Sequence, residues 1–467
     1  MTKDSGYDLA VIGAGSAAFA AAIRATSLDA RVALIERGTV GGTCVNVGCI
    51  PSKHLLAASQ TYRTAGDHPF KGVETRQSGV EMPGLIAKKE EVVQELRQEK
   101  YVDLAAHYGF EIVGGHARFS APDRLAVDGR EIGAAHIVIA TGSAPWAPPI
   151  DGLEEAGYLT STTAMDLAEL PESVVVIGGN YIGLELGQVF ANLGSKVTIV
   201  EGLERIAPLE EPEISEVMTQ ILTEQGIDVV TSAKVIRLEA GPPKTVVAET
   251  SGGELRLAGA EILVATGRRP VLDGLDLEKA GVERDDRGGL LLDETLRTTN
   301  PNVFAAGDVT GAPQFVYVAA AQGTLTATNA LMPAGRKMDY TALPRVTFTT
   351  PNIAAVGLTD EQAVQAGYRC ESRVVELRHV PRARVNLDTK GLFKIVADRP
   401  TGKVLGVHVL AENAGDVILA GVYAVKTGMT VEELADTWAP YLTMAEGIKL
   451  TAQSFTTDIE MLSCCAV

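Results

Sequence analysis

Hydrophobic residues near the start of the chain predict a strand, a helix and a second strand in close succession. The continuous apolar run Tyr7–Ile12 is typical of a buried strand, and apolar residues at helical spacing follow it from Phe19 to Ala25. A second apolar strand, Arg31–Ile35, ends at Glu36. A short turn rich in glycine and alanine, Gly13–Ala18, joins the first strand to the helix. The pattern therefore predicts a βαβ unit.

The same pattern returns in the middle of the chain. The apolar run Val174–Ile177 leads into the turn Gly178–Gly183, a helix to about Asn192, and a strand Lys196–Val200 that ends at Glu201. The interval from the first glycine to the strand-end acid is the same in both copies. Glycine turns of this kind between a strand and a helix characterise dinucleotide-binding units, so the sequence predicts two Rossmann-type domains.

Each copy is followed later by a short strand that ends in Ala-Thr-Gly. These strands are His136–Gly142 and Glu261–Gly267, and residues 84–108 between the first βαβ unit and its Ala-Thr-Gly strand show helical spacing. Two stretches that follow these strands predict places where the chain leaves a domain. They are the proline-rich stretch Pro145–Pro149 and the run Arg268–Pro270.

A different pattern begins at about Tyr340. The alternating stretches Val346–Thr349 and Gly391–Val396 predict antiparallel strands, and helical spacing returns over Ala414–Lys426 and Val431–Ala435. A chain of 467 residues is expected to form about three to four packed units. We therefore expect an α/β protein with two Rossmann-type domains and a C-terminal α+β domain. The expected boundaries are 1–147, 148–270, a central segment 271–340, and 341–467.

The charge of the chain excludes one class of partner. Its 59 acidic and 41 basic residues give a formal net charge of -18, which would repel a phosphate backbone, so we expect no nucleic-acid partner. The sequence has no apolar run of the roughly 18 to 20 residues that a membrane span needs. The first strand at Tyr7 leaves no room for a signal peptide, so we expect no membrane insertion and a cytoplasmic location.

The two glycine turns predict where dinucleotides bind. A pyrophosphate is held where a helix N-terminus meets a tight glycine turn, which assigns Gly13, Gly15 and the permitted small residue Ala18 to one site, and Gly178 and Gly183 to the other. In the second copy Asn180 replaces the middle glycine, and we expect it to be tolerated because Asn adopts the left-handed backbone region easily.

The second strand of each βαβ unit ends in an acidic residue, which bears on which dinucleotide binds there. Glu36 is expected to accept hydrogen bonds from ribose hydroxyls. Glu201 suits the free 2′-hydroxyl of NADH, whereas Arg205 close by in sequence could supply the cation that the 2′-phosphate of NADPH needs. The choice between NADH and NADPH stays open on these residues.

Two of the five cysteines follow directly on the first βαβ unit. Cys44 and Cys49 lie five positions apart at the predicted start of a helix, where the helix N-terminus stabilises a thiolate at Cys49. They are a candidate redox pair, and two buried apolar cysteines are the alternative. Cys370 stands alone and is interpreted as structural, and Cys464 and Cys465 are adjacent near the end of the chain.

The full string from Gly41 to Lys53 resembles the redox signature of the pyridine nucleotide-disulfide oxidoreductases, and the resemblance covers essentially the whole chain. It implies FAD at the first glycine turn and NADPH or NADH at the second. It also implies that Asp308, in Ala305–Asp308, accepts a hydrogen bond from the ribityl chain, and that Lys53 pairs with Glu185 beside the flavin. The remaining cofactor-binding positions implied by the family motifs are Thr43, Thr141, Gly142 and Gly267.

The far end of the chain departs from the members of this family that reduce disulfides. Those members carry a histidine that protonates the departing thiolate, and Tyr441 occupies the corresponding position when the chain is aligned on Glu446. Cys464 and Cys465 form a pair of soft ligands suited to capturing and passing on a soft metal ion. Together these two features resemble the members of the family that reduce Hg(II).

That resemblance implies a route for the metal. Hg(II), taken from its thiol complexes, would be bound by Cys464 and Cys465 of one subunit and passed to Cys44 and Cys49 of the other, which implies a homodimer and makes residues 341–467 a dimerisation domain with a Cys-Cys tail. The resemblance also implies roles for two tyrosines that match active-site tyrosines of the family. Tyr181 would gate the nicotinamide, and Tyr441 would contact the metal. With its first strand at Tyr7, the chain is expected to lack an additional N-terminal metal-binding domain.

Two other functions remain open on the sequence. The first is a dihydrolipoamide dehydrogenase-like or other NAD(P)H-dependent disulfide reductase, against which Tyr441 argues. The second is a metal carrier with a vestigial flavin fold, against which the intact Gly13, Gly15, Lys53 and Asp308 argue.

Overall fold

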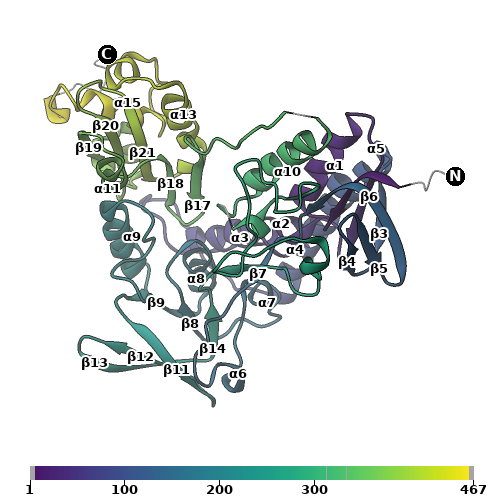
Figure 1. The fold of residues 1–467 in the computed structure, drawn as a ribbon. Helices are drawn as coiled ribbons and strands as arrows, with labels where there is room; N and C mark the ends of the chain where they lie inside the picture. Colours follow the sequence, from purple (N-terminus) through teal and green to yellow (C-terminus); the bar gives the residue numbers. More distant parts are fainter. Residues whose placement is uncertain (1–5, 312, 333, 462–467) are drawn as a thin grey trace, which may run out of the picture. The chain divides into compact units, whose positions relative to one another are not determined.

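The computed structural model describes residues 6–311, 313–332 and 334–461. They form two compact units, whose helices and strands carry the labels of Figure 1. The first unit combines the described part of residues 1–54 with residues 83–146 and 267–338, and the second combines residues 55–82 and 147–266 with the described part of 339–467. Each unit is therefore assembled from segments far apart in the sequence.

The first unit is built on a sheet whose parallel strands include both strands of the first predicted βαβ unit. Strand order is β3-β2-β1-β6-β5-β4, and β16 also pairs with β6. Leu9 of β1 lies opposite Val32 of β2 and His136 of β6, and the last four residues of β1 are buried, as expected of a continuous apolar run. The strands are β1 Tyr7–Ile12, β2 Val32–Glu36, β3 Glu111–Gly114, β4 Ala117–Ala121, β5 Arg124–Val127, β6 Arg130–Ile139 and β16 Val303–Ala305.

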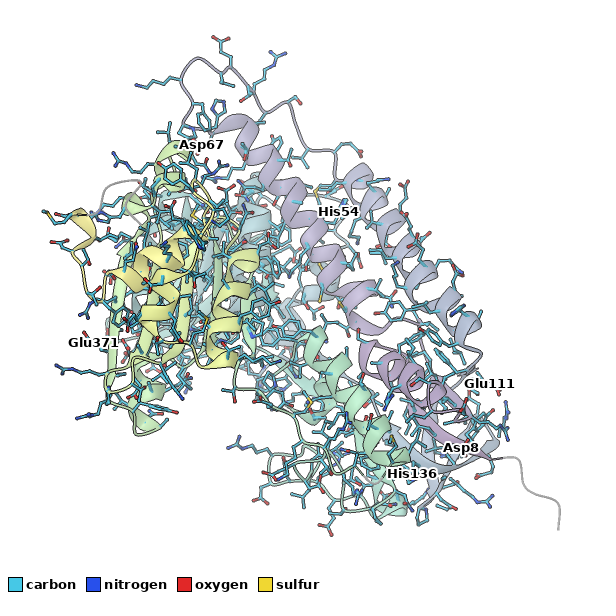
Figure 2. All side chains as sticks on the ribbon, turned by 90° about the horizontal axis from the view of Figure 1, so that it is seen from above. Asp8, His54, Asp67, Glu111, His136 and Glu371 are labelled. Carbon is cyan, nitrogen blue, oxygen red and sulfur yellow. The ribbon has the colours of Figure 1, made fainter. Side chains whose placement is uncertain are left out.

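The helices on this sheet approach one another closely because their facing residues are small. Helix α1 buries alanines along one side, and α10 packs against it with Gly323, where a Cβ atom would lie 2.1 Å from the carbonyl oxygen of Ala17. Helix α3 contains His54 and ends at Gly66, one residue before Asp67 (Figure 2). The helices that begin in this unit are α1 Ser16–Thr26, α2 Gly42–Val47, α3 Cys49–Gly66, the π-helix η1 Gln98–Val102, α5 Asp103–Tyr108, η2 Leu277–Ala280, η3 Asp308–Thr310 and α10 Val316–Leu331, with α4 Met82–Arg97 leading into η1.

The two exits predicted from the proline-rich stretches lie side by side. Strand β7, Ser143–Pro145, pairs antiparallel with β15, Arg268–Pro270, so that Arg268 lies opposite Pro145. The segments that leave and re-enter the first unit therefore run together directly after the two Ala-Thr-Gly strands.

In the second unit, residues 147–266 repeat the arrangement around the parallel sheet β10-β9-β8-β14, and a three-stranded antiparallel sheet, β11-β12-β13, accompanies it. The elements are α6 Leu153–Ala156, α7 Ser161–Ala164, β8 Ser173–Ile177, α8 Tyr181–Leu193, β9 Lys196–Val200, α9 Pro212–Glu224, β10 Ile227–Val230, β11 Lys234–Glu239, β12 Lys244–Thr250, β13 Gly253–Gly259 and β14 Glu261–Val264.

The C-terminal part of the second unit is an antiparallel sheet of order β17-β18-β21-β20-β19 with helices packed on it. The elements are β17 Pro344–Thr347, β18 Asn352–Gly357, α11 Asp360–Gln365, β19 Cys370–Glu376, η4 Leu377–His379, α12 Pro381–Asn386, β20 Leu392–Asp398, β21 Val404–Ala411, α13 Ala414–Thr427, α14 Val431–Asp436, α15 Glu446–Gln453 and η5 Ile459–Met461. The predicted fold class is confirmed. The strand expected at Val346–Thr349 begins earlier and ends at Thr347.

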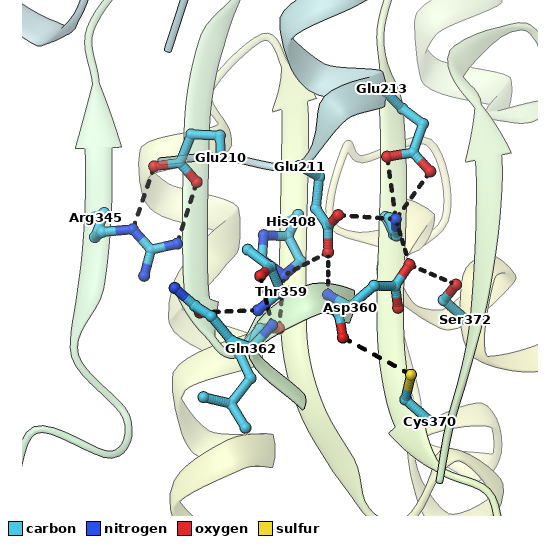
Figure 3. A network of polar contacts seen from close by, with 12 residues as sticks. Glu210, Glu211, Glu213, Arg345, Thr359, Asp360, Gln362, Cys370, Ser372 and His408 are labelled. Carbon is cyan, nitrogen blue, oxygen red and sulfur yellow. Dashed lines mark hydrogen bonds and ion pairs between the residues drawn. The ribbon is translucent and has the colours of Figure 1, made fainter. Parts of the chain in front are cut away.

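A network of buried charges joins the segment around α9 to the C-terminal sheet within the second unit (Figure 3). Lys394 of β20 is 2% exposed, and its ammonium lies 3.0 Å from Glu211, 2.8 Å from Glu213 and 2.7 Å from Asp360. Burial alone would lower the pKa of Lys394, but the hydrogen bonds to the three carboxylates outweigh it and raise that pKa. The side chain therefore stays charged, and its charge is balanced by carboxylates from two parts of the chain.

His408 of β21 lies in the same network and predicts how stability depends on pH. Its ring is fully buried, with Nε2 3.0 Å from the carbonyl oxygen of Leu358 and 3.7 Å from Glu211. Burial lowers the pKa of His408 below its ordinary value near 6.5. As the pH falls below about 6.5, the unfolded chain takes up a proton at this position before the folded chain does, so stability is lost between that value and the lowered folded pKa.

We accordingly expect the melting temperature to fall between pH 7 and pH 5.5, and to fall less in His408→Gln. Thermal unfolding at a series of pH values measures both. His107→Gln, which changes an exposed histidine of α5, serves as the control and should follow the wild type. An unchanged pH slope in His408→Gln would show that another group is responsible.

Candidate active site

The two glycine turns have nearly the same backbone geometry. Gly13 and Gly178 have φ angles of 116° and 112°, which favour glycine. A Cβ atom on Gly13 would lie 2.4 Å from the carbonyl oxygen of Ala140, and one on Gly178 would lie 2.5 Å from that of Ala265. In both copies, therefore, the first glycine lets the turn pass directly against the Ala-Thr-Gly strand.

The helices that follow these turns begin without a side-chain cap. Neither Gly15 before α1 nor Asn180 before α8 makes a side-chain hydrogen bond to the first turn of its helix. The first amide N–H groups of a helix need an acceptor, and a pyrophosphate supplies one together with the negative charge that the helix dipole favours. In the first unit the close approach of Gly42 to Gly15, where a Cβ on Gly42 would lie 2.6 Å from the Cα of Gly15, keeps side chains away from this turn. The residues present therefore fit the phosphates of two dinucleotides.

The reason given for tolerating Asn180 is wrong, although the substitution is accommodated. Asn180 has φ −113° and ψ −168°, an extended backbone that any residue adopts, and Gly15 at the same place in the first copy has φ −89° and ψ −170°. No left-handed conformation is required at the middle position of either turn. The last position of the second turn differs from the middle one, because it has no room for a side chain. A Cβ on Gly183 would lie 1.9 Å from the carbonyl oxygen of Gly178.

The acids at the strand ends are held in matching ways. Glu36 accepts hydrogen bonds from the backbone N–H groups of Ala14 at 2.9 Å and Gly38 at 2.7 Å. Glu201 accepts from Gly179 at 2.7 Å and Leu203 at 2.9 Å. Each carboxylate is therefore fixed against its glycine turn, with lone pairs left for further donors.

The cysteine pair lies where two helices meet in the first unit. Cys44 is in α2, and Cys49 is the first residue of α3, where the helix dipole favours a thiolate. Gly48 between them permits the turn, because a Cβ there would lie 2.8 Å from the carbonyl oxygen of Thr43. Both cysteines are partly exposed free thiols.

The surroundings of Cys44 affect its protonation. Hydrogen bonding to Cys49 raises the pKa of Cys44, and burial and the charge on Cys49 raise it further, against a smaller opposing effect of Lys53. Cys44 therefore keeps its proton at neutral pH and donates it toward the sulfur of Cys49. The arrangement prepares Cys49 as the nucleophilic thiolate of the pair.

A half-buried arginine, Arg268, lies near both Cys49 and Asp308 within the first unit. Arg268 of β15 donates from Nε to the hydroxyl of Ser143 at 2.8 Å and from Nη2 to the Ser143 carbonyl at 2.6 Å, and that hydroxyl donates to Asp308 at 2.7 Å. Burial lowers the pKa of Arg268, and the charges of Asp308 and Cys49 only partly oppose this effect. The guanidinium still carries its charge at neutral pH, because arginine is an exceptionally strong base. It is thus a fixed positive charge beside two groups that the sequence singled out.

Replacing Arg268 by methionine is expected to lower both FAD retention and the reactivity of Cys49 by about 10- to 100-fold, because charged hydrogen bonds to Ser143 and a counter-charge to Asp308 and Cys49 are lost. The flavin-to-protein absorbance ratio and the rate of Cys49 alkylation measure the two effects. Arg269→Met is the matched control, since Arg269 is exposed and lies over the ring of Trp146 at 4.0 Å. Equal losses in both variants would refute the role of Arg268.

Tyr101 also lies near the cysteine pair, in the π-helix η1. Burial raises its pKa, and the charges of Cys44 and Cys49 add to the increase. Its hydroxyl lies 3.3 Å from that of Ser16, and its ring packs edge-on against Phe19 with centroids 4.8 Å apart. π-helical turns often occur at functional sites, and here one places a tyrosine near both cysteines and near Ser16 of the first glycine turn.

Two of the predicted site residues, Tyr181 and Glu185, lie on one side of α8 in the second unit. Tyr181, its first residue, directs its hydroxyl at Glu210 over 3.4 Å, and Glu210 in turn forms an ion pair with Arg345 at 3.2 Å. Glu185 is 6% exposed and accepts a hydrogen bond of 2.9 Å from the backbone of Phe348. Strand β17 and the residues after it therefore hold both side chains in place.

The other predicted residues divide between the units. Lys53 belongs to the first unit and Glu185 to the second, so their pairing stays a prediction. Thr141 donates to the carbonyl of Val271 at 2.6 Å, and Gly142 and Gly267 have positive φ angles of 68° and 126°. Thr43 is exposed, and Ala18 is fully buried against the sheet of the first unit.

The C-terminal site residues lie in and after the last domain. Tyr441 is 49% exposed. Glu446 begins α15, and burial raises its pKa. Cys464 and Cys465 lie outside the described residues. Within the described ranges there is no group of three or more His, Cys, Asp or Glu side chains that could hold a metal ion, and no helix has the length and apolarity for a membrane crossing.

Sequence reasoning missed Arg268, Ser143 and Tyr101. Arg268 was interpreted only as part of a domain exit, although its position directly after an Ala-Thr-Gly strand places it at the edge of the sheet where ligands of such folds bind. Nothing in the local sequence around Tyr101 indicated its contacts, because they depend on segments more than fifty residues away.

Comparison with known proteins gives one consistent result over the whole chain. The family model of the pyridine nucleotide-disulphide oxidoreductases matches residues 7–323, and that of their dimerisation domain matches residues 343–452. The chain is 53% identical over 470 residues to a mercuric reductase of Streptomyces lividans, with 99% of each protein covered. It is 50% identical over 461 residues to a mercuric reductase of Bacillus cereus, with 98% of this chain and 73% of that protein covered.

A solved structure agrees with the sequence comparison. The HOCl-induced flavoprotein disulfide reductase RclA from Escherichia coli matches with a TM-score of 0.86 and 32% identity, over 97% of this chain and 100% of that one. Both the sequence and the fold lead to the same conclusion: the chain belongs to the pyridine nucleotide-disulfide oxidoreductase family.

Proposed function

We propose that this chain reduces Hg(II) to Hg(0) with electrons from NAD(P)H, by way of FAD and the Cys44–Cys49 pair. The reaction balances as NAD(P)H and Hg(II) giving NAD(P)⁺, a proton and Hg(0). The observation that carries the proposal is that the chain keeps the cysteine pair but has no histidine after His408, the last of its seven. Disulfide cleavage needs a general acid for the departing thiolate, whereas reduction of a bound metal ion does not.

The first unit supplies the FAD and metal site in this proposal. Gly13, Gly15 and the N-terminus of α1 would hold the pyrophosphate, and Glu36 would hold the ribose. Bound FAD would take two electrons from NAD(P)H and deliver them to the cysteine pair or to the metal held there. Lys53, which we propose to pair with Glu185, would place a positive charge beside the flavin. Asp308, held through Ser143 and Arg268, is proposed to bind the ribityl chain.

The two cysteines have successive roles in binding the metal. Cys49, at the N-terminus of α3, is the thiolate that attacks first, and Cys44 gives up its proton as the ion replaces it between the sulfurs. Two thiolates suit a soft divalent ion better than oxygen or nitrogen ligands do. Reduced mercury carries no charge for them to hold, and it leaves.

The second unit supplies the nicotinamide site and the contact between subunits. Gly178, Gly183 and α8 would bind the dinucleotide, and Tyr181, held by Glu210, would close over the nicotinamide. A homodimer is part of the proposal, supported by the match to a dimerisation domain and by exposed apolar side chains at Leu419, Tyr423 and Trp438. A cytoplasmic location is also part of the proposal, because thiols stay reduced there.

We further propose that Cys464 and Cys465 of one subunit deliver Hg(II) to the other subunit's pair, where Tyr441 contacts it. The double variant Cys464→Ala/Cys465→Ala is expected to slow Hg(II)-dependent NAD(P)H oxidation about tenfold or more when thiols are in excess, because two soft ligands on the delivery route are lost. Steady-state assays with and without excess thiol measure the effect. Ser463→Ala is the matched control, and an unchanged rate in the double variant would rule out delivery by the tail.

A further inference from the structure

We infer that Glu201 makes this chain selective for NADH over NADPH. The inference deepens the proposed function and rests on it only in assigning the nicotinamide dinucleotide to the glycine turn Gly178–Gly183. The difference between the two dinucleotides is one group, a hydroxyl or a phosphate at the 2′ position of the adenosine ribose. The strand-end acid of a Rossmann unit is placed to meet that group.

Glu201 cannot turn away from this position without losing two hydrogen bonds. Its Oε2 accepts from the N–H of Gly179 at 2.7 Å, and its Oε1 accepts from the N–H of Leu203 at 2.9 Å. Its carboxylate also lies directly against the turn, since a Cβ on Gly179 would come within 3.3 Å of Oε2. The negative charge is therefore fixed beside the first residues of the glycine turn.

The first unit contains an internal reference for this arrangement. Glu36 accepts from Ala14 at 2.9 Å and Gly38 at 2.7 Å, the equivalent backbone positions of the first copy. The dinucleotide that family membership assigns to that copy is FAD, whose adenosine ribose carries a free 2′-hydroxyl. The same carboxylate geometry at both turns thus indicates that both sites take an adenosine ribose without a 2′-phosphate.

The guanidinium of Arg205, the cation that could have favoured NADPH, is held against its own loop, and its Nε is buried. Arg205 is the only cationic residue between Glu201 and Ala207, and its terminal nitrogen donates to the carbonyl oxygens of Pro208 at 3.1 Å and Glu210 at 3.3 Å. These bonds hold the loop that leads to Glu210. The other charged side chain in this stretch, Glu204, is exposed and negative. A 2′-phosphate beside Glu201 would therefore meet its fixed carboxylate, while the guanidinium of Arg205 is held by the backbone of its own loop.

The expected preference follows from this charge balance. A 2′-hydroxyl can donate a hydrogen bond to Glu201, whereas a 2′-phosphate cannot and is repelled by it. Because the site is open to solvent and screened by salt, we expect NAD⁺ to bind about 10- to 100-fold more tightly than NADP⁺. Calorimetric titration of the oxidised, FAD-loaded protein with each dinucleotide measures this ratio without any metal or turnover.

Two variants and one matched control test the cause. Glu201→Gln removes the charge and should reduce the ratio to within about threefold. Gly202→Arg leaves both hydrogen bonds of Glu201 intact and adds a cation beside it, at an exposed position where a Cβ meets no atom within 4 Å, and should strengthen NADP⁺ binding about tenfold. Glu204→Gln makes the same charge change as Glu201→Gln three residues further along and should keep most of the preference.

The outcomes separate this inference from the proposed function. Equal or tighter binding of NADP⁺ by the wild type, or an unchanged ratio in both Glu201→Gln and Gly202→Arg, would overturn the selectivity of Glu201. A chain that prefers NAD⁺ and loses that preference in these variants supports the inference even if it fails to reduce Hg(II), a failure that would overturn only the proposed function.

Discussion

Serine in place of Cys49 is expected to abolish Hg(II) reduction, by about a thousandfold or more, while the protein keeps its FAD. The reason is that Cys49, at the N-terminus of α3 and near Arg268, is the proposed thiolate of the pair, and a serine hydroxyl neither ionises at neutral pH nor binds a soft metal. Cys44→Ser should lose activity to a similar extent, because one sulfur cannot hold the ion for reduction. Hg(II)-dependent NADH oxidation measures the loss, and flavin absorbance shows that the fold is kept.

Cys370 provides the control for this experiment. Cys370 is the first residue of β19 in the C-terminal sheet, and its sulfur lies 3.9 Å from the carbonyl oxygen of Asp360. We expect Cys370→Ser to keep nearly full activity. Alkylation of the reduced wild type at neutral pH should label Cys49 before Cys44, because hydrogen bonding to Cys49 raises the pKa of Cys44. Faster labelling of Cys44 would contradict the assigned protonation of the pair.

The largest effect on stability is expected at Lys394. Its ammonium is the shared counter-charge of Glu211, Glu213 and Asp360, and Lys394→Met would leave these carboxylates without it, although the side chain of Glu211 is only 2% exposed. Removing one partner of a buried ion pair costs about 3–5 kcal/mol, which corresponds to a fall of about 6–10 °C in melting temperature for a unit of this size. Differential scanning calorimetry measures the shift.

Lys390 is the matched control for Lys394. It forms an ion pair with Glu224 but is 58% exposed, and exposed pairs contribute about 0–1 kcal/mol. We therefore expect Lys390→Met to melt within about 2 °C of the wild type. If the two variants melted alike, the buried network would not be what joins the segment around α9 to the C-terminal sheet.

The features that the sequence predicted depend on local spacing. The strands at Tyr7–Ile12 and Lys196–Val200 were predicted with their bounds correct. The first is an apolar run that ends at a glycine turn, and the second lies between Gly194 and the acid Glu201. The duplicated turn also indicated the duplicated geometry, which the structure repeats down to the Cβ clearances of Gly13 and Gly178.

The features that the sequence did not predict depend on contacts between distant segments. Lys394 looks like an ordinary surface lysine in the sequence, and its burial arises only when Glu211 and Asp360 are brought to it from elsewhere in the chain. Arg268 is comparable, since Ser143, its hydrogen-bond partner, precedes it by 125 residues.

The central claim is that the Cys44–Cys49 pair reduces a metal ion and not a disulfide. The most direct measurement compares NADH oxidation by the purified, FAD-loaded protein with Hg(II) in excess thiol and with lipoamide or glutathione disulfide as acceptors. The account predicts turnover with Hg(II), release of Hg(0), and rates with either disulfide at least about a hundredfold lower, because the general acid for thiolate departure is missing. Turnover of a disulfide at a rate comparable to or above that with Hg(II) would contradict it.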